Sequence, residues 1–410
     1  MNISEVTKDI FRLSVNLDRI LFEGIWPVPN GVSLNSYIIK GEKTAIVDGV
    51  CDWDGVPETL FALLDKLNVK LDSIDYVIIN HMEPDHTGWL ENFKKIKPDF
   101  KIITGKKTPP LLKAYLGITE NIQVVKDGDT LDLGNGKILE FMEIPNVHWP
   151  ETIATFEKSS GTLLPCDAFG SFGTVNEKGY DDELTAQELA FFEKEALRYY
   201  SNIVSAFSPA VKKAIEKASS LPIKIIAPGH GIVWRKNPEI IIKDYLRYAS
   251  YQKNPDSKEI TLIWGSMYGN TEKAVKPAIE AMEKEGVRVN VHKVPEDSWG
   301  DILTSVWGSS GVVLAMPTYE YKMYPPMAAV LEEIGRKKAH NRKAFRFGSY
   351  GWSGGAQKEL DEILEKYKMN WHFLGSVEFN GRPEKEDIDA VVSGCRALAN
   401  AVLDSAADSK

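Results

Sequence analysis

Cysteine is scarce in this chain, and its spacing argues against several kinds of site. Three cysteines, Cys51, Cys166 and Cys395, occur in 410 residues, and none belongs to a CxxC pair. A disulfide framework and a cysteine-ligated zinc or iron–sulfur site are therefore not expected. We interpret all three as reduced thiols, which agrees with a cytoplasmic location.

The sequence also lacks a basic surplus and a long apolar run. Its 49 lysines and arginines against 58 acids give a net charge of −9, whereas a nucleic-acid-binding surface needs a basic patch. No apolar run approaches the roughly 20 residues that span a bilayer. The acid-containing start, MNISEVTKDIFRL, is unlike a secretory signal. We therefore expect neither a nucleic acid nor a membrane among the partners.

The length of 410 residues exceeds one ordinary hydrophobic core, so two domains are expected. Periodicity fails at residues 251–259, YQKNPDSKE, where polar residues cluster with a proline as in a linker. Before it, strand-like pieces lead into alternating strands and helices, and residues 183–221 look helical with a break at Pro209. After it, short buried strands alternate with long helical patterns, which predicts a parallel, doubly wound sheet.

Metal-seeking side chains gather in HMEPDHTGW, residues 81–89, directly after the strand-like run DSIDYVIIN. Three further apolar runs also end in a residue of this type. We expect these strand ends to lie side by side in one sheet, so that their loops converge on one pocket. The candidate metal ligands are His81, Glu83, Asp85, His86, His148, Asp167 and His230.

Each of these residues alone is better explained as an ordinary surface or hydrogen-bonded side chain, but their joint occurrence indicates a metal site. Four histidines and three carboxylates can hold two cations, and Asp167 could bridge them. The arrangement resembles the metallo-β-lactamase fold, whose hydrolases carry HxHxDH at this loop. Glu83 stands at the second histidine of that pattern. Its carboxylate adds negative charge and a harder oxygen donor, which suits iron better than zinc.

A second candidate site lies after the linker. Residues 260–274, ITLIWGSMYGNTEKA, run from a strand through a hydroxyl- and glycine-containing loop into a helix, a geometry that holds a phosphate. The loop is neither a Walker loop nor a GxGxxG turn. The alternative for this loop alone is a helix start capped by Thr271.

Two later loops, residues 316–326 and 348–356, offer backbone N–H groups and aromatic faces. Gly354 and Gly355 permit close backbone approach. Three such loops in the order of flavodoxin favour FMN, whose flat isoalloxazine ring binds well between aromatics. The candidate FMN contacts are Ser266, Met267, Tyr268, Gly269, Asn270, Thr271, Pro317, Thr318, Tyr319, Glu320, Tyr321, Ser349, Tyr350, Gly351, Trp352, Ser353 and Gly354.

Together these motifs resemble the flavodiiron proteins almost end to end. The resemblance rests on HMEPDH, on HWPET at 148–152, on Asp167, on PGHG at 228–231 and on the flavodoxin-like segment 258–405. It implies an α/β fold: a metallo-β-lactamase-like αββα sandwich over residues 1–251, followed by a flavodoxin-like doubly wound sheet over residues 252–410. It also implies two iron ions and one FMN per chain.

The resemblance assigns each candidate ligand to an iron. One ion is held by His81, Glu83 and His148, the other by Asp85, His86 and His230, and Asp167 bridges the two. The residue at the position of His86 is not coordinated in every member of the family. Trp149 is interpreted as a packing wall of the pocket.

The activity implied by the resemblance is reduction of O2 to water or of NO to N2O, with electrons passing through FMN. The donor is expected to be a separate molecule, either a rubredoxin-like protein or the reduced deazaflavin F420, because a fused rubredoxin would need CxxC pairs. A head-to-tail homodimer, or a dimer of dimers, is expected. Two rival hypotheses remain: a dinuclear metallohydrolase with an accessory flavin domain, and a flavin-dependent electron carrier whose metal domain is structural only.

Overall fold

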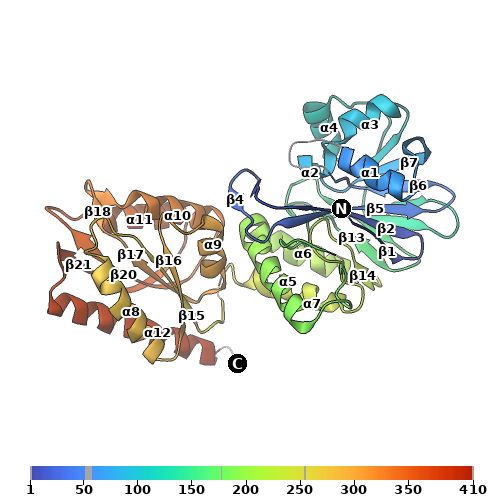
Figure 1. Cartoon of the computed structure of the whole chain (residues 1–410). Coiled ribbons are helices and arrows are strands. Elements are labelled where there is room, and N and C mark those ends of the chain that lie inside the picture. Colours follow the sequence, from blue (N-terminus) through green and yellow to red (C-terminus); the bar gives the residue numbers. More distant parts are fainter. Residues whose placement is uncertain (1, 51–57, 177, 254, 409–410) are drawn as a thin grey trace. The chain divides into compact units, whose positions relative to one another are not determined.

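A computed structural model describes residues 2–50, 58–176, 178–253 and 255–408 (Figure 1). The chain divides into two compact units, Met1–Arg247 and Tyr248–Lys410, and each is described by itself. The domain boundary near residue 252, inferred from the linker composition, stays a prediction. Cys51 lies outside the described residues, whereas Cys166 and Cys395 are buried free thiols. Within the described part of the chain, no helix is long and apolar enough to cross a membrane.

The first unit begins with a seven-stranded sheet in the order β1-β2-β5-β6-β7-β8-β9. Neighbouring strands are antiparallel from β1 to β6 and parallel from β6 to β9. Eight of the nine residues of β5 are buried, so this sheet is covered on both faces. The strands are β1 Asn2–Thr7, β2 Ile10–Leu17, β5 Val32–Lys40, β6 Thr44–Val47, β7 Ile74–Ile79, β8 Lys101–Gly105 and β9 Ile122–Val125.

A five-stranded sheet in the order β10-β11-β12-β13-β14 forms the second layer of strands. It is antiparallel except between β13 and β14. A separate small hairpin pairs β3 with β4. These strands are β3 Leu21–Phe22, β4 Trp26–Pro27, β10 Thr130–Asp132, β11 Ile138–Glu143, β12 Ile153–Glu157, β13 Thr162–Leu164 and β14 Ile225–Ile226.

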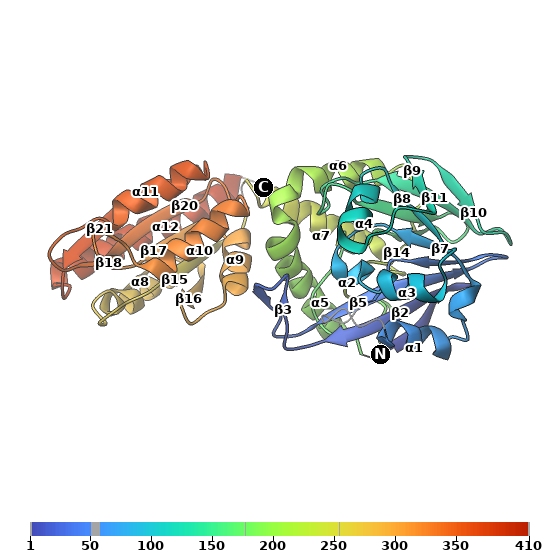
Figure 2. The same cartoon turned by 90° about the horizontal axis from the view of Figure 1, so that it is seen from above.

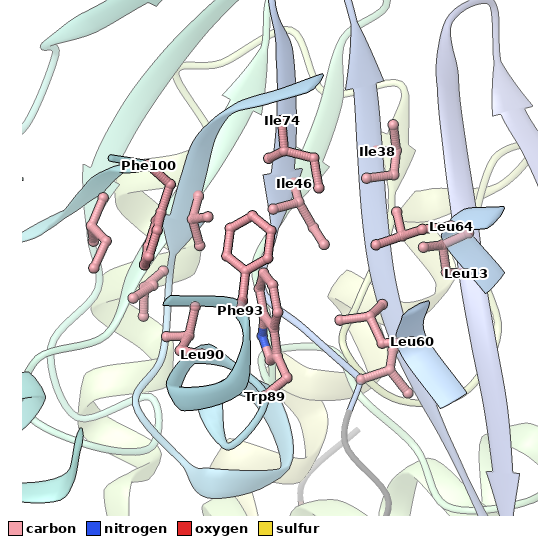
Figure 3. Packing of buried hydrophobic residues seen from close by; sticks show 14 of the residues in the cluster. Leu13, Ile38, Ile46, Leu60, Leu64, Ile74, Trp89, Leu90, Phe93 and Phe100 are labelled. Atoms are coloured by element: carbon pink, nitrogen blue, oxygen red, sulfur yellow. The ribbon is translucent and has the colours of Figure 1, made fainter. Parts of the chain in front are cut away.

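Side-chain alternation along the central strands explains the layers. Ile38 and Ile46 point to the helical side of the first sheet, where they join a core that contains Trp89 (Figure 3). Their neighbours Ile39 and Val47 point to the opposite face and join a core shared with the second sheet. Successive residues of a strand face opposite ways, so both cores follow from one apolar run. The helices and short turns on this side are α1 Glu58–Lys66, η1 Leu71–Ser73, α2 Pro84–Thr87, α3 Leu90–Ile96 and α4 Thr108–Leu116.

A second group of helices packs on the outer side of the five-stranded sheet (Figure 1). The helical pattern predicted for residues 183–221 is confirmed, and Pro209 lies in the first turn of a new helix, as expected. The complete unit is thus an αββα sandwich. This group contains α5 Ala186–Tyr199, the π-helical turn η2 Tyr200–Val204, η3 Ser205–Phe207, α6 Ser208–Ala218 and α7 Pro238–Ser250.

The second unit contains an all-parallel sheet in the order β16-β15-β17-β20-β21. Helices α8 and α12 cover one face, and α9, α10 and α11 cover the other (Figure 1, Figure 2). Counted along this unit the order is 2-1-3-4-5, the flavodoxin-like order, whose ligand crevice lies beyond the carboxyl ends of the first and third strands. The elements are β15 Glu259–Trp264, α8 Glu272–Lys284, β16 Arg288–Lys293, α9 Trp299–Gly308, β17 Gly311–Ala315, β18 Thr318–Tyr319, β19 Lys322–Met323, α10 Pro325–Arg336, β20 Lys343–Tyr350, α11 Ala356–Lys366, β21 His372–Asn380 and α12 Lys385–Asp408.

Candidate metal centre and flavin site

The predicted metal ligands come together from loops of both sheets of the first unit. His81 lies in the loop after β7, which belongs to the seven-stranded sheet. His148, Asp167 and His230 lie in the loops after β11, β13 and β14, which belong to the five-stranded sheet. The expectation that one sheet supplies all the loops was therefore wrong. The loops still converge because the two sheets pack face to face and their ends adjoin.

The loop after β7 is held in shape by local hydrogen bonds. Pro84 starts the single turn α2, which carries Asp85 and His86. Thr87 Oγ1 donates to the carbonyl oxygen of Glu83 at 3.0 Å. The indole of Trp89 donates to the carbonyl oxygen of His86 at 3.0 Å. These contacts place ligand-type side chains from one short turn around a common point.

One half of the centre contains His81, Glu83 and His148 around one oxygen of Asp167. Asp167 Oδ2 lies 3.0 Å from His148 Nε2 and 3.5 Å from His81 Nε2. Glu83 Oε2 lies 3.1 Å from His148 Nε2 and 3.3 Å from His81 Nε2. All four side chains are buried, and their ligand atoms lie within 4.8 Å of one another.

The other half contains Asp85, His86 and His230 around the second oxygen of Asp167. Asp167 Oδ1 lies 2.9 Å from His86 Nε2 and 3.2 Å from His230 Nε2. Asp85 Oδ2 lies 3.6 Å from His86 Nε2 and 3.5 Å from His230 Nε2. Asp167 thus presents one oxygen to each set of three side chains, as a carboxylate that bridges two cations must.

Unsatisfied polar atoms test whether these residues fit a metal pair. Both carboxylate oxygens of Asp85, Oδ2 of Asp167 and Nε2 of His230 are buried without a hydrogen-bond partner. Burial of a carboxylate without a donor is costly, and a bound cation removes that cost. The mixed imidazole and carboxylate set suits iron. The residues present therefore fit two cations.

The electrostatics of the cluster couple metal binding to protons. Burial lowers the pKa of His86, but the carboxylates of Asp85 and Asp167 outweigh it and raise the pKa to about 10. Burial likewise lowers the pKa of His148, and Asp167 with Glu83 raises it to about 9. Burial raises the pKa of Asp167, but the surrounding histidines hold it well below its ordinary value. A metal ligand must be a neutral imidazole, so metal binding displaces these protons.

Two supporting contacts of the centre were missed by the sequence analysis. Glu151 Oε1 lies 2.8 Å from His81 Nδ1 and accepts from the backbone N–H of Met82 at 3.0 Å. His230 Nδ1 donates to the carbonyl oxygen of Ser33 at 3.2 Å. Each contact leaves Nε2 of its histidine free to face the centre. The only sequence signal was an acid three residues after His148.

Aromatic rings enclose the histidines. Trp149 packs edge-on against His81 with ring centroids 5.1 Å apart, in agreement with its interpretation as a wall. Phe22 packs edge-on against His230 at 5.5 Å. Tyr199 is fully buried with its ring 5.5 Å from His230, and its hydroxyl has no hydrogen-bond partner. The centre is therefore lined mainly by apolar surface outside its ligands.

The predicted phosphate loop of the second unit lies between β15 and α8, at the expected crevice. The backbone N–H of Gly269 donates to Ser266 Oγ at 3.0 Å. Thr271 is buried, and its hydroxyl lies 3.1 Å from the hydroxyl of Ser349. It makes no side-chain capping bond to α8, so the alternative that Thr271 caps the helix was wrong. Its hydroxyl instead joins the first loop to the third.

The other two predicted loops present aromatic faces. Glu320 and Tyr321 form the two-residue turn between β18 and β19, with φ of 45° and 66°. The rings of Tyr321 and Trp352 lie 6.3 Å apart, and these side chains are 64% and 77% exposed. A Cβ on Gly355 would lie 2.0 Å from the Tyr321 carbonyl oxygen, so this close approach requires glycine. The remaining predicted FMN contacts lie on the same three loops or on the adjoining residues of β18 and β20. Exposed aromatics beside N–H-rich loops fit a flat phosphorylated cofactor.

Comparison with known proteins places the chain in a family. Residues 32–231 match the family model of the ODP family beta lactamase, and residues 262–393 match that of flavodoxin. An anaerobic nitric oxide reductase flavorubredoxin from Vibrio vulnificus is 36% identical over 345 residues, which make up 83% of this chain and 68% of that protein. The chain belongs to the flavodiiron protein family. It spans about two thirds of the length of this flavorubredoxin.

Solved flavodiiron structures share the whole fold. A flavo di-iron protein variant from Thermotoga maritima is 28% identical with a TM-score of 0.87, over 97% of this chain and 98% of that one. The rubredoxin oxygen:oxidoreductase from Desulfovibrio gigas, 24% identical, has a TM-score of 0.91 over 98% and 99% of the two chains. The predicted fold class is confirmed. Membership of the flavodiiron family also confirms FMN and a di-iron centre as the predicted cofactors.

Proposed function

We propose that this flavodiiron protein reduces NO to N2O or O2 to water. The observation that carries the proposal is the position of Asp167, which offers one oxygen to each of two three-residue ligand sets. The same chain adds a flavodoxin-like unit. A shared carboxylate between two metal positions provides a dinuclear reaction site, and a flavin provides its electrons.

We assign one iron to His81, Glu83 and His148, and the other to Asp85, His86 and His230, with Asp167 between them. When bound, FMN supplies single electrons, and the iron pair supplies a reducing site for a diatomic substrate. The three ligand carboxylates offset three of the four positive charges of two ferrous ions, and the buried carboxylate of Glu151 beside His81 offsets the fourth. Glu151 and Ser33 hold His81 and His230 in position through hydrogen bonds to their Nδ1 atoms.

The chain's own residues also protect the site and hold the flavin. The rings of Phe22 and Trp149 beside the histidines exclude water from the centre. We assign the FMN phosphate to the N–H groups of residues 266–271 and the N-terminus of α8. We assign the isoalloxazine ring to the faces of Tyr321 and Trp352.

The partners follow from the same assignment. Rubredoxin appears in the name of the Desulfovibrio gigas enzyme and within the name flavorubredoxin. We propose a separate rubredoxin-like protein or reduced F420 as the electron donor. We further propose a cytoplasmic head-to-tail homodimer, or a dimer of dimers, in which each flavin serves the partner's metal centre.

The deciding experiment measures metal content and turnover on the same sample. Protein expressed with ample iron should contain about two iron atoms and one FMN per chain. Reduced anaerobically, it should consume NO or O2, and the two rates measured separately rank the substrates. Two zinc atoms together with esterase activity, and no gas consumption, would instead support the metallohydrolase.

The assembly is tested with two inactive variants that are co-expressed. One carries Asp167→Ala, and the other carries a substitution that abolishes FMN binding. A purified heterodimer then contains one intact flavin and one intact metal centre in different chains, and it should recover part of the activity. Inactive heterodimers made from folded, dimeric parents would contradict transfer between chains.

A further inference from the structure

A small apolar cavity in the first unit lies between the five-stranded sheet and helices α6 and α7. It leaves about 20 Å³ for the centre of a water-sized molecule. A cavity needs roughly 10–15 Å³ by this measure to hold one such molecule, so there is room for one. Every lining side chain is apolar except Tyr245, whose hydroxyl donates to the carbonyl oxygen of Gly170 at 2.7 Å.

The cavity borders two of the segments that form the metal centre. Val147 and Ala168 contribute to its lining, and both are buried. Val147 directly precedes His148, and Ala168 directly follows Asp167. Two metal-ligating segments therefore form part of the cavity wall. The cavity therefore adjoins the chain segments that carry His148 and Asp167.

A larger outer pocket of about 390 Å³ lies next to the cavity. It is formed by the turn after β11 and by α6, and its lining includes the polar Lys213 and Lys217. Ile144 and Ala214 line both the pocket and the cavity. Ile144 and Ala214 therefore form part of the wall between the apolar cavity and the outer pocket.

The chemistry of the cavity selects its occupant. A water molecule needs two to four polar partners, and the one polar side chain of this lining, Tyr245, already donates its hydroxyl hydrogen to Gly170. A small uncharged gas needs no hydrogen bond and gains from leaving water for an apolar surface. We propose that the cavity holds the diatomic substrate gas on its way from the outer pocket, past Ile144 and Ala214, to the side of the centre formed by His148 and Asp167. The identity of the gas as NO or O2 rests on the proposed function.

A matched pair of substitutions on α6 tests the passage. Ala214→Leu places extra methyl groups in the shared wall. Ala210→Leu makes the same change one turn earlier, at a half-buried residue that lines the outer pocket but not the cavity. With iron and FMN content equal to wild type, Ala214→Leu should lower the second-order rate constant of the reduced holoenzyme with gas in stopped flow. It should leave the rate at saturating gas unchanged, and Ala210→Leu should behave as wild type.

Noble-gas binding supplies a readout that does not depend on activity. Holoenzyme crystals pressurised with krypton should show anomalous density in the cavity, more strongly in Val211→Ala, which enlarges it, and not in Ala214→Leu. If neither wild type nor Val211→Ala takes up krypton, the gas site is refuted. If krypton binds but both leucine variants react at the wild-type rate, the passage is refuted while the proposed function stands. If krypton binds and the protein reduces neither gas, the proposed function fails and the apolar gas site stands.

Discussion

Glu151 offers the sharpest test of how the protein matrix supports the metal centre. Its buried Oε1 contacts His81 Nδ1 at 2.8 Å and Met82 N at 3.0 Å, while Oε2 has no hydrogen-bond partner. Glu151→Gln preserves both contacts if the amide oxygen replaces Oε1, and it removes only the charge. Glu151→Ala removes the charge and both contacts. The two variants therefore separate the charge of Glu151 from its geometry.

Loss of a partner of this kind typically costs 10- to 100-fold in metal affinity, or about 1.4 to 2.7 kcal/mol. We expect Glu151→Gln near the lower end of that range, because both contacts remain. We expect Glu151→Ala near the upper end. The loss should affect mainly the ion held by His81, Glu83 and His148, because Glu151 makes no contact with Asp85, His86 or His230 in the described hydrogen bonds.

The assay is anaerobic competition between ferrous-loaded protein and a chelator, with released iron followed over chelator concentration. Glu157→Gln is the matched control, because Glu157 is a buried acid in the same unit that bonds to Ser159 and Ser160 rather than to a ligand. Wild type and the control should release both ions together, whereas the Glu151 variants should release one ion early. Equal retention of both ions by Glu151→Ala and wild type would refute the reasoning.

Three further changes have defined outcomes. Asp167→Ala removes the shared oxygens, so iron analysis should show loss of both ions rather than one. Thr271→Val removes the hydroxyl that contacts Ser349, and FMN titration should show affinity reduced by about 1–3 kcal/mol; unchanged affinity would contradict the role of this contact. Burial raises the pKa of Glu157, but hydrogen bonds from Ser159 and Ser160 outweigh it and lower the pKa. The charge of Glu157 therefore stabilises the fold above its unfolded pKa of about 4.3, and this stabilisation is lost as pH falls through the lower folded pKa. Glu157→Gln should unfold about 1.5–3 kcal/mol more easily at pH 7, and this difference in denaturant titrations should shrink in acid.

Local sequence patterns predicted individual strands and helices better than they predicted how the strands are distributed between the two sheets. Apolar runs such as those in β7 and β15 were recognisable as strands, and Pro209 marked the start of α6. The distribution of strands between two sheets was not readable, because an apolar run covered on both faces looks the same in either sheet. That is why the ligand loops were wrongly assigned to one sheet.

The candidate sites show the same difference: the sequence identified single ligand-type residues but not their long-range contacts. A residue such as His81 could be identified because its type and its place after a strand carry chemical information. Its supporting partner could not be identified, since Glu151 lies 70 residues away and nothing local indicates that contact. The bond of Thr271 to Ser349, 78 residues on, was likewise invisible and replaced the local helix cap that the sequence suggested.

The origin of the ligands in both sheets makes the metal pair a cross-link between the two β layers. One side of the link starts at β7 in the seven-stranded sheet, and the other starts at β11, β13 and β14 in the five-stranded sheet. Ligand binding stabilises a fold by about 2.7 kcal/mol when the free ligand is at 100 times its Kd. Here the free energy of metal binding opposes separation of the seven-stranded sheet from the five-stranded sheet. A bound iron pair would therefore also stabilise the fold, and protein made without iron should be both inactive and less resistant to unfolding.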